Sequence, residues 1–258
     1  MKRTLLTVAL ISFSLAANAN ENPAEAAAHA VNHHAAHWGY EGETGPSHWA
    51  EMSDEFTLCG AGENQSPIDV AGDFDVELPA IKFNYSTKPT KIVNNGHTVQ
   101  VDIAAGSSMT VNGKTFQLKQ FHFHTPSENT INGKQYPLEA HYVHRSDSDN
   151  SFAVISVMFE EGEANPVLDQ VWEKMPAKAR ETVELETDLD FTQLRPEDTS
   201  YYYFNGSLTT PPCTEGIYWH VMKKPLTASK EQIEKFLAVM QHPNNRPVQK
   251  TGARVVVE

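Results

Sequence analysis

Strand-like alternation of hydrophobic and polar positions dominates this chain. Alternation lets one face of a strand pack on a core while the other face carries polar groups. The dipeptide Asn112-Gly113 separates two such runs, and it supplies the positive φ angles of a tight hairpin turn. The strands predicted from the pattern are 91–103, which alternates only in parts, 109–111, 115–124, 139–145 and 151–160.

Helical periodicity is confined to two segments. The clearer one begins at Ser229, where Gln232 predicts a capping box, and its apolar face carries Ile233, Phe236, Leu237 and Met240. A shorter helix is expected around 167–175. No internal repeat or linker divides the chain from Trp38 onward. The pattern therefore predicts one mainly β (α+β) domain over 37–258, with few helices.

The N-terminal residues are typical of an export signal. Lys2 and Arg3 precede an apolar run over 5–17, and Ala17-Asn18-Ala19 has the small-x-small form of a cleavage site. We expect a signal peptide over 1–19 and a periplasmic or secreted protein. The run is shorter than the ~20 apolar residues of a membrane span, so an uncleaved anchor is the weaker alternative.

Residues 20–36 form an Ala-rich segment that is expected to be a tail. It holds three histidines, and His37 follows directly after it. Helical spacing could bring His29, His33 and His37 to one face, although a polar terminal segment of this kind is typically mobile. The cluster suggests a zinc-sequestering protein as an alternative function, which would bind several ions per chain.

The net charge excludes some classes of partner. Lys and Arg total 20 against 33 Asp and Glu, which gives −13, and loss of Lys2 and Arg3 with the signal makes the charge −15. An acidic protein is not attracted to phosphate backbones or anionic lipid, so nucleic acid and membrane partners are not expected.

The chain has two cysteines, Cys59 and Cys213. In an exported protein a lone, distant pair of this kind favours a disulfide over a metal or redox site. Two free buried thiols are the alternative.

Three histidines on two predicted strands indicate a metal site. His122 and His124 lie two residues apart, so both project from one strand face, and His141 can join them if the two strands are neighbours. Gln120 and Glu139 precede their histidines by two residues and can orient the rings. Three protein ligands with a fourth position open are the arrangement of catalytic zinc.

The remaining histidines of the body are interpreted differently. His144 falls on the strand face opposite to His141, which favours a structural role. His48, His220 and His242 stand alone in the sequence. Isolated histidines are more often core or surface residues than ligands.

Sequence blocks spread over nearly the whole chain resemble α-class carbonic anhydrases. They occur in the order of that family: HWGY at 37–40 and GPSHW at 45–49, NQSPID at 64–69, NNGHTVQV at 94–101, QFHFHTPSE at 120–128, EAHYVH at 139–144, GSLTTPPC at 206–213 and EGIYWHV at 215–221. The resemblance implies reversible hydration of carbon dioxide to bicarbonate by a zinc-bound hydroxide, with one Zn²⁺ per chain.

The resemblance also assigns roles to individual residues. It implies that His122, His124 and His141 bind the zinc, that Thr209 orients the nucleophile and that Glu128 accepts from Thr209. The residues implied to receive carbon dioxide are Val143, Val154, Leu208, Thr209, Thr210 and Trp219. His97 is implied to be the proton shuttle, with a water network at Tyr40, Asn95 and Gln100. The pair Cys59 and Cys213 matches the disulfide of exported members, which would tether the Thr209 loop.

The fold implied by the resemblance is a single domain on a large, mostly antiparallel twisted sheet with short peripheral helices. Members of this kind are often homodimers, but no residue decides that here. The chain departs from the family pattern at Thr125-Pro126, at the short turn 146–150 and in its His-rich tail. A catalytically silent member is the alternative, and it would be expected to lack one of the zinc histidines, all of which are present.

Overall fold

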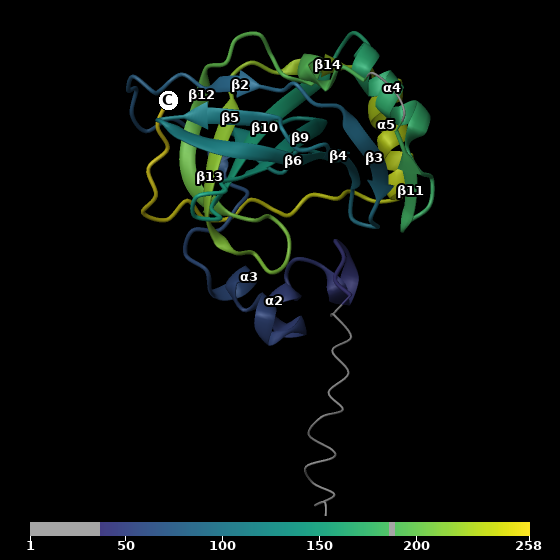
Figure 1. Ribbon diagram of the computed structural model, residues 1–258. Coiled ribbons are helices and arrows are strands. Elements are labelled where there is room, and N and C mark those ends of the chain that lie inside the picture. Colours follow the sequence, from purple (N-terminus) through teal and green to yellow (C-terminus); the bar gives the residue numbers. More distant parts are fainter. Residues whose placement is uncertain (1–36, 186–188) are drawn as a thin grey trace, which may run out of the picture. The chain divides into compact units, whose positions relative to one another are not determined.

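A computed structural model describes residues 37–185 and 189–258 (Figure 1). The proposed signal peptide and the tail over 20–36 lie outside the described residues. The helices are η1 (Gly42–Thr44), α2 (Trp49–Met52), η2 (Asp54–Phe56), α3 (Leu58–Ala61), α4 (Pro166–Lys174), η3 (Phe191–Leu194) and α5 (Lys230–Met240). The strands are β1 (Asp69–Val70), β2 (Lys82–Asn84), β3 (Pro89–Asn94), β4 (Val99–Ile103), β5 (Ser108–Val111), β6 (Lys114–His124), β7 (Thr130–Ile131), β8 (Lys134–Gln135), β9 (Leu138–Arg145), β10 (Phe152–Glu161), β11 (Glu181–Glu184), β12 (Tyr201–Ser207), β13 (Glu215–Met222) and β14 (Leu226–Ala228).

One large sheet organises the described residues. Eleven strands belong to it, with the order β11-β3-β4-β6-β9-β10-β13-β12, while β14 pairs with β10 and β2 with β5. Within the described chain its pairings are antiparallel, except that β10 runs parallel to β13 and β14. The large, mostly antiparallel sheet with few short helices confirms the expected fold class. A small second sheet joins β1, β7 and β8.

The predicted hairpin is present, with its turn at the Asn112-Gly113 pair. Asn112 and Gly113 adopt φ angles of 49° and 75°, and they connect β5 to β6. The prediction of one strand over 91–103 was wrong, because the chain reverses between β3 and β4. Gly96 takes a φ of 90° there, and the Asn95 side-chain oxygen accepts from the backbone N–H groups of His97 and Thr98. A turn held by an asparagine side chain replaces the middle of the expected strand.

Two apolar clusters lie on opposite faces of the sheet. The larger includes Phe121 and Phe123 of β6, on which Trp172 of α4 and Phe236 of α5 pack. These two helices lie side by side (Figure 1), and the rings of Trp172 and Phe236 stack 5.2 Å apart. The smaller cluster contains Trp219 and lies on the other face, beside the three candidate ligands.

The N-terminal ends of both longer helices are capped, and the capping box predicted for α5 is confirmed. Asn165 accepts from two backbone N–H groups at the start of α4, and Ser229 with Gln232 forms the capping box of α5. The Gln232 amide also donates to the Asn165 carbonyl at 2.7 Å, so the two helix starts are joined. No helix among the described residues is both long and apolar enough to cross a bilayer.

Candidate metal centre

Strand pairing brings the three candidate ligands together. β6 and β9 are antiparallel neighbours, and His122 lies directly opposite His141. The ring centres of His122 and His124 are 5.1 Å apart, and that of His141 lies 5.4 Å and 4.7 Å from them. One nitrogen from each ring lies within 4.8 Å of the others, which is the only such group of potential metal ligands in the described part of the chain.

A hydrogen bond on the outer nitrogen of each ring determines which nitrogen faces the centre. His122 Nδ1 donates to Gln120 Oε1 at 2.8 Å, His124 Nδ1 to the carbonyl of Asn244 at 2.7 Å and His141 Nε2 to Glu139 Oε1 at 2.8 Å. All three acceptors lack a proton to give, so the bonded nitrogens carry the hydrogens. The lone pairs of His122 Nε2, His124 Nε2 and His141 Nδ1 are therefore left at the centre.

Two of the rings, those of His122 and His124, are held in the neutral form that a metal requires. Burial lowers the pKa of His122 well below its usual value, and mutual repulsion with His124 and His141 adds to this. Burial also lowers the pKa of His124, against an opposing effect of the Asn244 carbonyl. Neutral imidazoles keep their lone pairs free for a cation.

Glu139 is a fully buried carboxylate with five hydrogen bonds. Besides His141, it accepts from the backbone N–H groups of Glu128 and Asn129, from the Asn129 amide and from the Ser156 hydroxyl, at 2.6 to 2.9 Å. Burial opposes its ionisation, but the interaction with His141 and these donors outweigh burial and hold the pKa at about 2. The acceptor that orients His141 is thus itself rigidly held.

Glu128 points one oxygen into the centre. Its Oε1 accepts from the backbone N–H of Arg246 at 2.9 Å, while Oε2 lies 3.4 Å from His124 Nε2 and 3.9 Å from His141 Nδ1. Within the described residues, His124 Nε2 and Glu128 Oε2 are buried without a hydrogen-bond partner. Burial raises the pKa of Glu128 to about 7, against the effects of His141, the Arg246 N–H and the Thr209 hydroxyl. Two unpaired buried atoms that face each other fit a bound cation.

An apolar wall borders the centre on one side. Val143, Val154, Leu208 and Trp219 belong to one cluster, and the Trp219 ring lies 4.9 Å from that of His141. Trp219 donates its indole N–H to the Ser207 carbonyl at 3.0 Å, which fixes the ring. Thr209 is buried and Thr210 is half-buried in the loop that follows β12.

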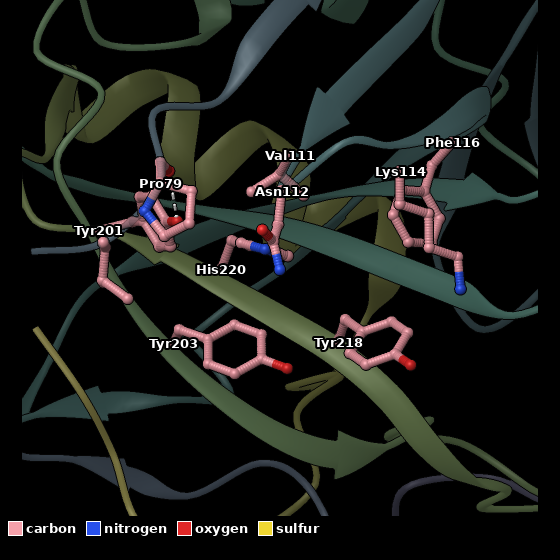
Figure 2. A pocket seen from close by; sticks show the side chains of 10 residues that line it. Pro79, Val111, Asn112, Lys114, Phe116, Tyr201, Tyr203, Tyr218 and His220 are labelled. Atoms are coloured by element: carbon pink, nitrogen blue, oxygen red, sulfur yellow. Dashed lines mark hydrogen bonds between the residues drawn. The ribbon is translucent and has the colours of Figure 1, made fainter.

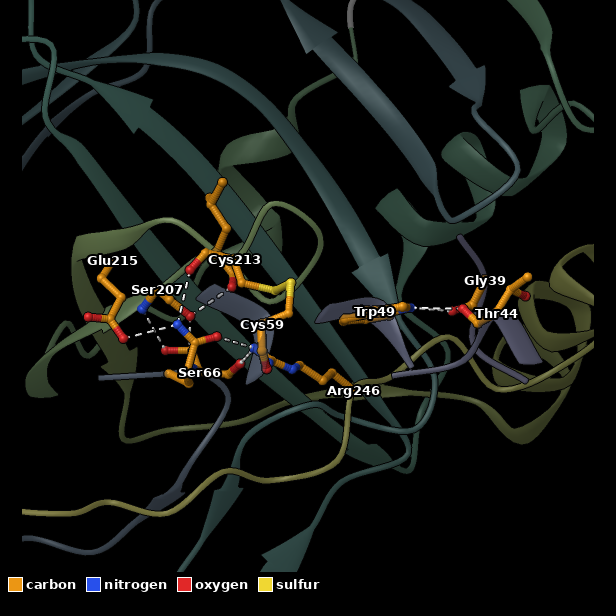
Figure 3. The surroundings of a disulfide bond; sticks show 11 residues. Gly39, Thr44, Trp49, Cys59, Ser66, Ser207, Cys213, Glu215 and Arg246 are labelled. Carbon is orange, nitrogen blue, oxygen red and sulfur yellow. Dashed lines mark hydrogen bonds between the residues drawn. A yellow bond between two sulfur atoms is a disulfide. The ribbon is translucent and has the colours of Figure 1, made fainter. Parts of the chain in front are cut away.

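The predicted disulfide is present and ties this loop to the N-terminal part of the domain (Figure 3). Cys59 and Cys213 are bonded, with their Cα atoms 5.1 Å apart. The Cys213 N–H donates to the Thr210 carbonyl, and the Gln65 amide donates to the Cys213 carbonyl. The loop that carries Thr209 is therefore held from two directions.

Arg246 is a residue that the sequence reasoning missed. Its buried guanidinium donates to the carbonyls of Cys59 and Ser66 (Figure 3) and to Gln65 Oε1, at 2.8 to 2.9 Å. Its backbone N–H donates to Glu128. One residue thus joins the disulfide region to the carboxylate of the centre. No sequence motif indicated Arg246 or Asn244. Arg246 contacts Glu128 through its backbone N–H, and Asn244 contacts His124 through its backbone carbonyl.

His97, the residue expected to shuttle protons, packs against an aromatic side chain. His97 is half-buried and stacks on Trp38, with ring centres 3.7 Å apart and planes 9° apart. Burial, with smaller effects of His37 and His242, lowers the pKa of His97 to about 4.

The other expected members of the water network are largely engaged with the protein. Asn95 holds its own turn, and the Gln100 amide donates to Asp102 at 2.5 Å. The Tyr40 hydroxyl is buried and has no partner among the described residues. Burial, and to a lesser degree Glu128, raises the pKa of Tyr40 well above its usual value.

The lone histidines separate into distinct environments. His144, on the face opposite to His141, uses both ring nitrogens in hydrogen bonds, to the Tyr85 hydroxyl at 2.7 Å and to the Tyr142 carbonyl at 2.9 Å. His48 is partly exposed beside Glu51. His242 lies near Tyr40, with ring centres 6.1 Å apart. His220 is buried.

Comparisons with known proteins assign the chain to a family. Residues 44–258 match the profile of the eukaryotic-type carbonic anhydrases. A carbonic anhydrase of Neisseria gonorrhoeae is 47% identical over 255 residues, which cover 98% of this chain and 95% of that protein. A carbonic anhydrase of Pectobacterium carotovorum is 42% identical over 221 residues, which cover 86% and 90%.

Solved structures agree with this. A hyperthermostable carbonic anhydrase from a hydrothermal vent chimney superimposes with a TM-score of 0.83 at 49% identity, covering 86% of this chain and 99% of that one. The Thermovibrio ammonificans enzyme, solved with the inhibitor sulfanilamide, gives 0.81 at 45% identity over 86% and 99%. The chain therefore belongs to the eukaryotic-type, or α-class, carbonic anhydrase family, and it is an enzyme of that class.

Proposed function

We propose that this chain catalyses the zinc-dependent, reversible hydration of carbon dioxide to bicarbonate and a proton. The observation that carries the proposal is the convergence of one nitrogen from each of three imidazole rings, each with its outer nitrogen bonded, beside an apolar wall. A polar metal site next to an apolar surface suits a reaction between water and a nonpolar gas.

His122 Nε2, His124 Nε2 and His141 Nδ1 are proposed to hold the zinc. Three neutral ligands leave the full charge of Zn²⁺ in place, and zinc in such a site lowers the pKa of water to about 7, which makes a nucleophile available at neutral pH. The unpaired Glu128 Oε2 fits a nearby cation, because an opposite charge favours the ionised carboxylate and opposes the effect of burial on its pKa.

Thr209 and Glu128 are proposed to orient the nucleophile. An ionised carboxylate can only accept hydrogen bonds, so the Thr209 hydroxyl must donate a hydrogen bond to Glu128. The Thr209 oxygen is then left to accept a hydrogen bond from the nucleophile, whose lone pair is turned toward the substrate. Two restraints hold Thr209 and Glu128 in position: the hydrogen bond from the Arg246 N–H to Glu128 Oε1, and the disulfide that tethers the Thr209 loop.

The apolar wall is proposed to receive carbon dioxide. Val143, Val154, Leu208 and Trp219 offer no hydrogen bond toward the substrate, since the indole N–H of Trp219 is used by Ser207. A nonpolar molecule can displace water from such a surface at little cost, whereas the charged product is not retained there. Thr210 borders the same space from the loop.

His97 is proposed to carry the proton to solvent. A histidine stacked on Trp38 with a pKa of about 4 is a poor acceptor from an acid of pKa about 7. We propose that the ring works when it leaves the stack, because an exposed imidazole has a pKa near 6.5 and can both accept and release a proton. A turnover of about 10⁶ s⁻¹, which this chemistry can reach, would need a relay, since release to bare water from an acid of pKa 7 is limited to roughly 10³ s⁻¹.

Export of the chain is also proposed. The segment 1–19 has the pattern of a signal peptide, and the Cys59–Cys213 disulfide is typical of an oxidising compartment. We therefore place the mature protein in the periplasm or outside the cell.

The proposed function is tested by stopped-flow measurement of carbon dioxide hydration on protein whose metal content has been determined. The expected result is activity proportional to zinc, reaching its maximum at one ion per chain. Protein with one zinc per chain and no hydration activity would contradict the proposal. Several tightly bound ions per chain, with hydration independent of them, would favour zinc sequestration by the N-terminal histidines instead.

A further inference from the structure

A cavity lies on the sheet face opposite to the metal centre. It has a volume of about 310 Å³ and lies over β12, β13 and the hairpin between β5 and β6 (Figure 2). Alternation along β13 explains its position. Trp219 contacts the ring of His141 on the metal face, so its neighbours Tyr218 and His220 project from the other face.

The walls of this cavity are aromatic and preformed. The ring of His220 lies 5.2 Å from that of Tyr201 and 5.3 Å from that of Tyr203, and the rings of Phe116 and Tyr218 are 6.0 Å apart. Figure 2 shows Tyr203 and Tyr218 projecting along one side of the pocket. The Tyr201 hydroxyl donates to the Pro79 carbonyl at 2.7 Å, which fixes its ring. Flat rings at these spacings suit a planar guest.

His220 is one of the polar residues that line the cavity, with Asn112 beside it. The residue is 2% exposed, and its Nδ1 is buried without a hydrogen-bond partner among the described residues. Burial lowers the pKa of His220 to about 4, against the effects of the Tyr218 and Val154 carbonyls, so the ring is neutral at pH 7. A neutral imidazole has one N–H donor and one acceptor nitrogen, and no described residue bonds to Nδ1. A buried polar atom that lacks a partner calls for a ligand or a water.

The charge at the rim is already compensated. The Lys114 ammonium lies 5.1 Å from the centre of the Phe116 ring and 5.2 Å from that of Tyr218, and it pairs with Asp149 at 2.6 Å. An anion would have to compete with Asp149 for this cation. The cavity therefore favours a neutral guest.

We propose that this cavity binds a neutral, planar aromatic molecule of one or two rings that carries a single hydrogen-bond donor directed to His220. The volume supports this size, because a cavity of about 150 Å³ suffices for benzene and ligand sites begin near 300 Å³. Indoles and hydroxyarenes have this chemistry. Nothing in the proposal depends on the reaction at the metal centre.

Titration of the holoenzyme with 5-fluoroindole, followed by ¹⁹F NMR, tests the proposal. We expect saturable binding to the wild-type protein. His220→Phe keeps the ring and removes the acceptor, and about tenfold weaker binding is expected, which corresponds to the loss of about 1.4 kcal/mol from one hydrogen bond. Leu78 lines the cavity, and Leu78→Trp is expected to fill part of its volume and abolish binding.

A matched variant on the metal face distinguishes the two sites. Val143→Phe adds comparable bulk to the apolar wall, so it should leave 5-fluoroindole affinity unchanged if the probe binds behind the sheet. Thermal unfolding of each variant checks that it is folded. Absence of saturable binding at millimolar probe, loss of binding in Val143→Phe, or equal affinity in the wild type and Leu78→Trp would overturn the proposal. Equal affinity in His220→Phe would overturn the role of His220.

Discussion

Two histidines on one strand show what distinguishes a ligand from a core residue. His141 and His144 lie three residues apart on β9 and are equally buried, at 2% and 0% exposure, but on opposite faces of the sheet. His144 has a hydrogen bond at each ring nitrogen, whereas His141 has one at Nε2 and leaves Nδ1 directed at the centre. Burial alone therefore does not identify a metal ligand. The informative feature is an unsatisfied nitrogen that meets others like it.

The largest expected effect is the loss of a ligand. His124→Ala should lower zinc affinity by more than the roughly 10- to 100-fold that follows loss of a ligand's hydrogen-bond partner, and hydration should become undetectable. Zinc analysis and stopped-flow hydration measure both. His144→Ala is the matched control on the other face: it should destabilise the fold but keep one zinc and its activity. One tightly bound zinc with near-normal activity in His124→Ala would refute the ligand assignment.

The next effect concerns His144, on the opposite face of the sheet, which should make the free energy of unfolding fall at acidic pH. Burial lowers the pKa of His144 to about 3, while an unfolded histidine titrates near 6.5. The unfolded chain thus binds a proton first, so stability is lost as pH falls below 6.5, by about 3 kcal/mol from this residue at pH 4. The variant His144→Phe has no titrating group at this position, so it lacks this loss of stability at low pH.

Denaturant unfolding of the wild type and His144→Phe at pH 7 and pH 4 measures this effect. Other groups titrate alike in both proteins, so the stability difference between them should shrink by about 3 kcal/mol at pH 4. A difference that does not change with pH would show that His144 is not held neutral by the fold.

A smaller effect is expected from the carboxylate behind His141. Glu139→Gln removes the charge and replaces one acceptor oxygen by an NH₂ group, which cannot accept the hydrogen bonds that the surrounding donors offer. The His141 ring should then lose its fixed orientation. Zinc affinity should fall roughly 10- to 100-fold, as measured by competition with a chelator. Glu160→Gln, a more exposed change on β10, is the control and should leave affinity unchanged. Unaltered affinity in Glu139→Gln would mean that His141 is oriented by other contacts.

The smallest expected effect concerns proton release. His97→Ala should lower kcat by about tenfold or more and leave kcat/KM nearly unchanged, because proton transfer follows the carbon dioxide step. Added imidazole should restore much of kcat, and His48→Ala serves as an exposed control. Stopped-flow assays in dilute buffer give both parameters. An unchanged kcat would remove His97 from the mechanism.

Much of the metal face could be predicted from sequence, because strand parity is local. Gln120, His122 and His124 share one face of β6 by their spacing alone, and the same holds for Glu139 and His141 on β9. The alternation of side chains could not predict the register that places His122 opposite His141. That register depends on a bulge between Leu118 and Gln120 and on pairing across the sheet.

Other features were hidden because they rest on backbone atoms or on distant strands. The aromatic run at the start of β12 does not alternate, and the parallel pairing of β10 with β13 joins segments about 60 residues apart. The Asn244 carbonyl and the Arg246 N–H act through atoms that every residue has. The hydrogen bonds of the Asn95 oxygen within its own turn and of the Gln100 amide to Asp102 were not predicted either, and the role of both residues in a water network stays a prediction.

The central claim is that the outer hydrogen bonds decide which nitrogen of each ring is free for zinc. Long-range ¹H–¹⁵N NMR of the histidine rings in the zinc-loaded enzyme tests it most directly, since it reports the protonated nitrogen of each ring. The account predicts Nδ1–H in His122 and in His124, and Nε2–H in His141. The same tautomer in all three rings, or a His141 protonated at Nδ1, would contradict it.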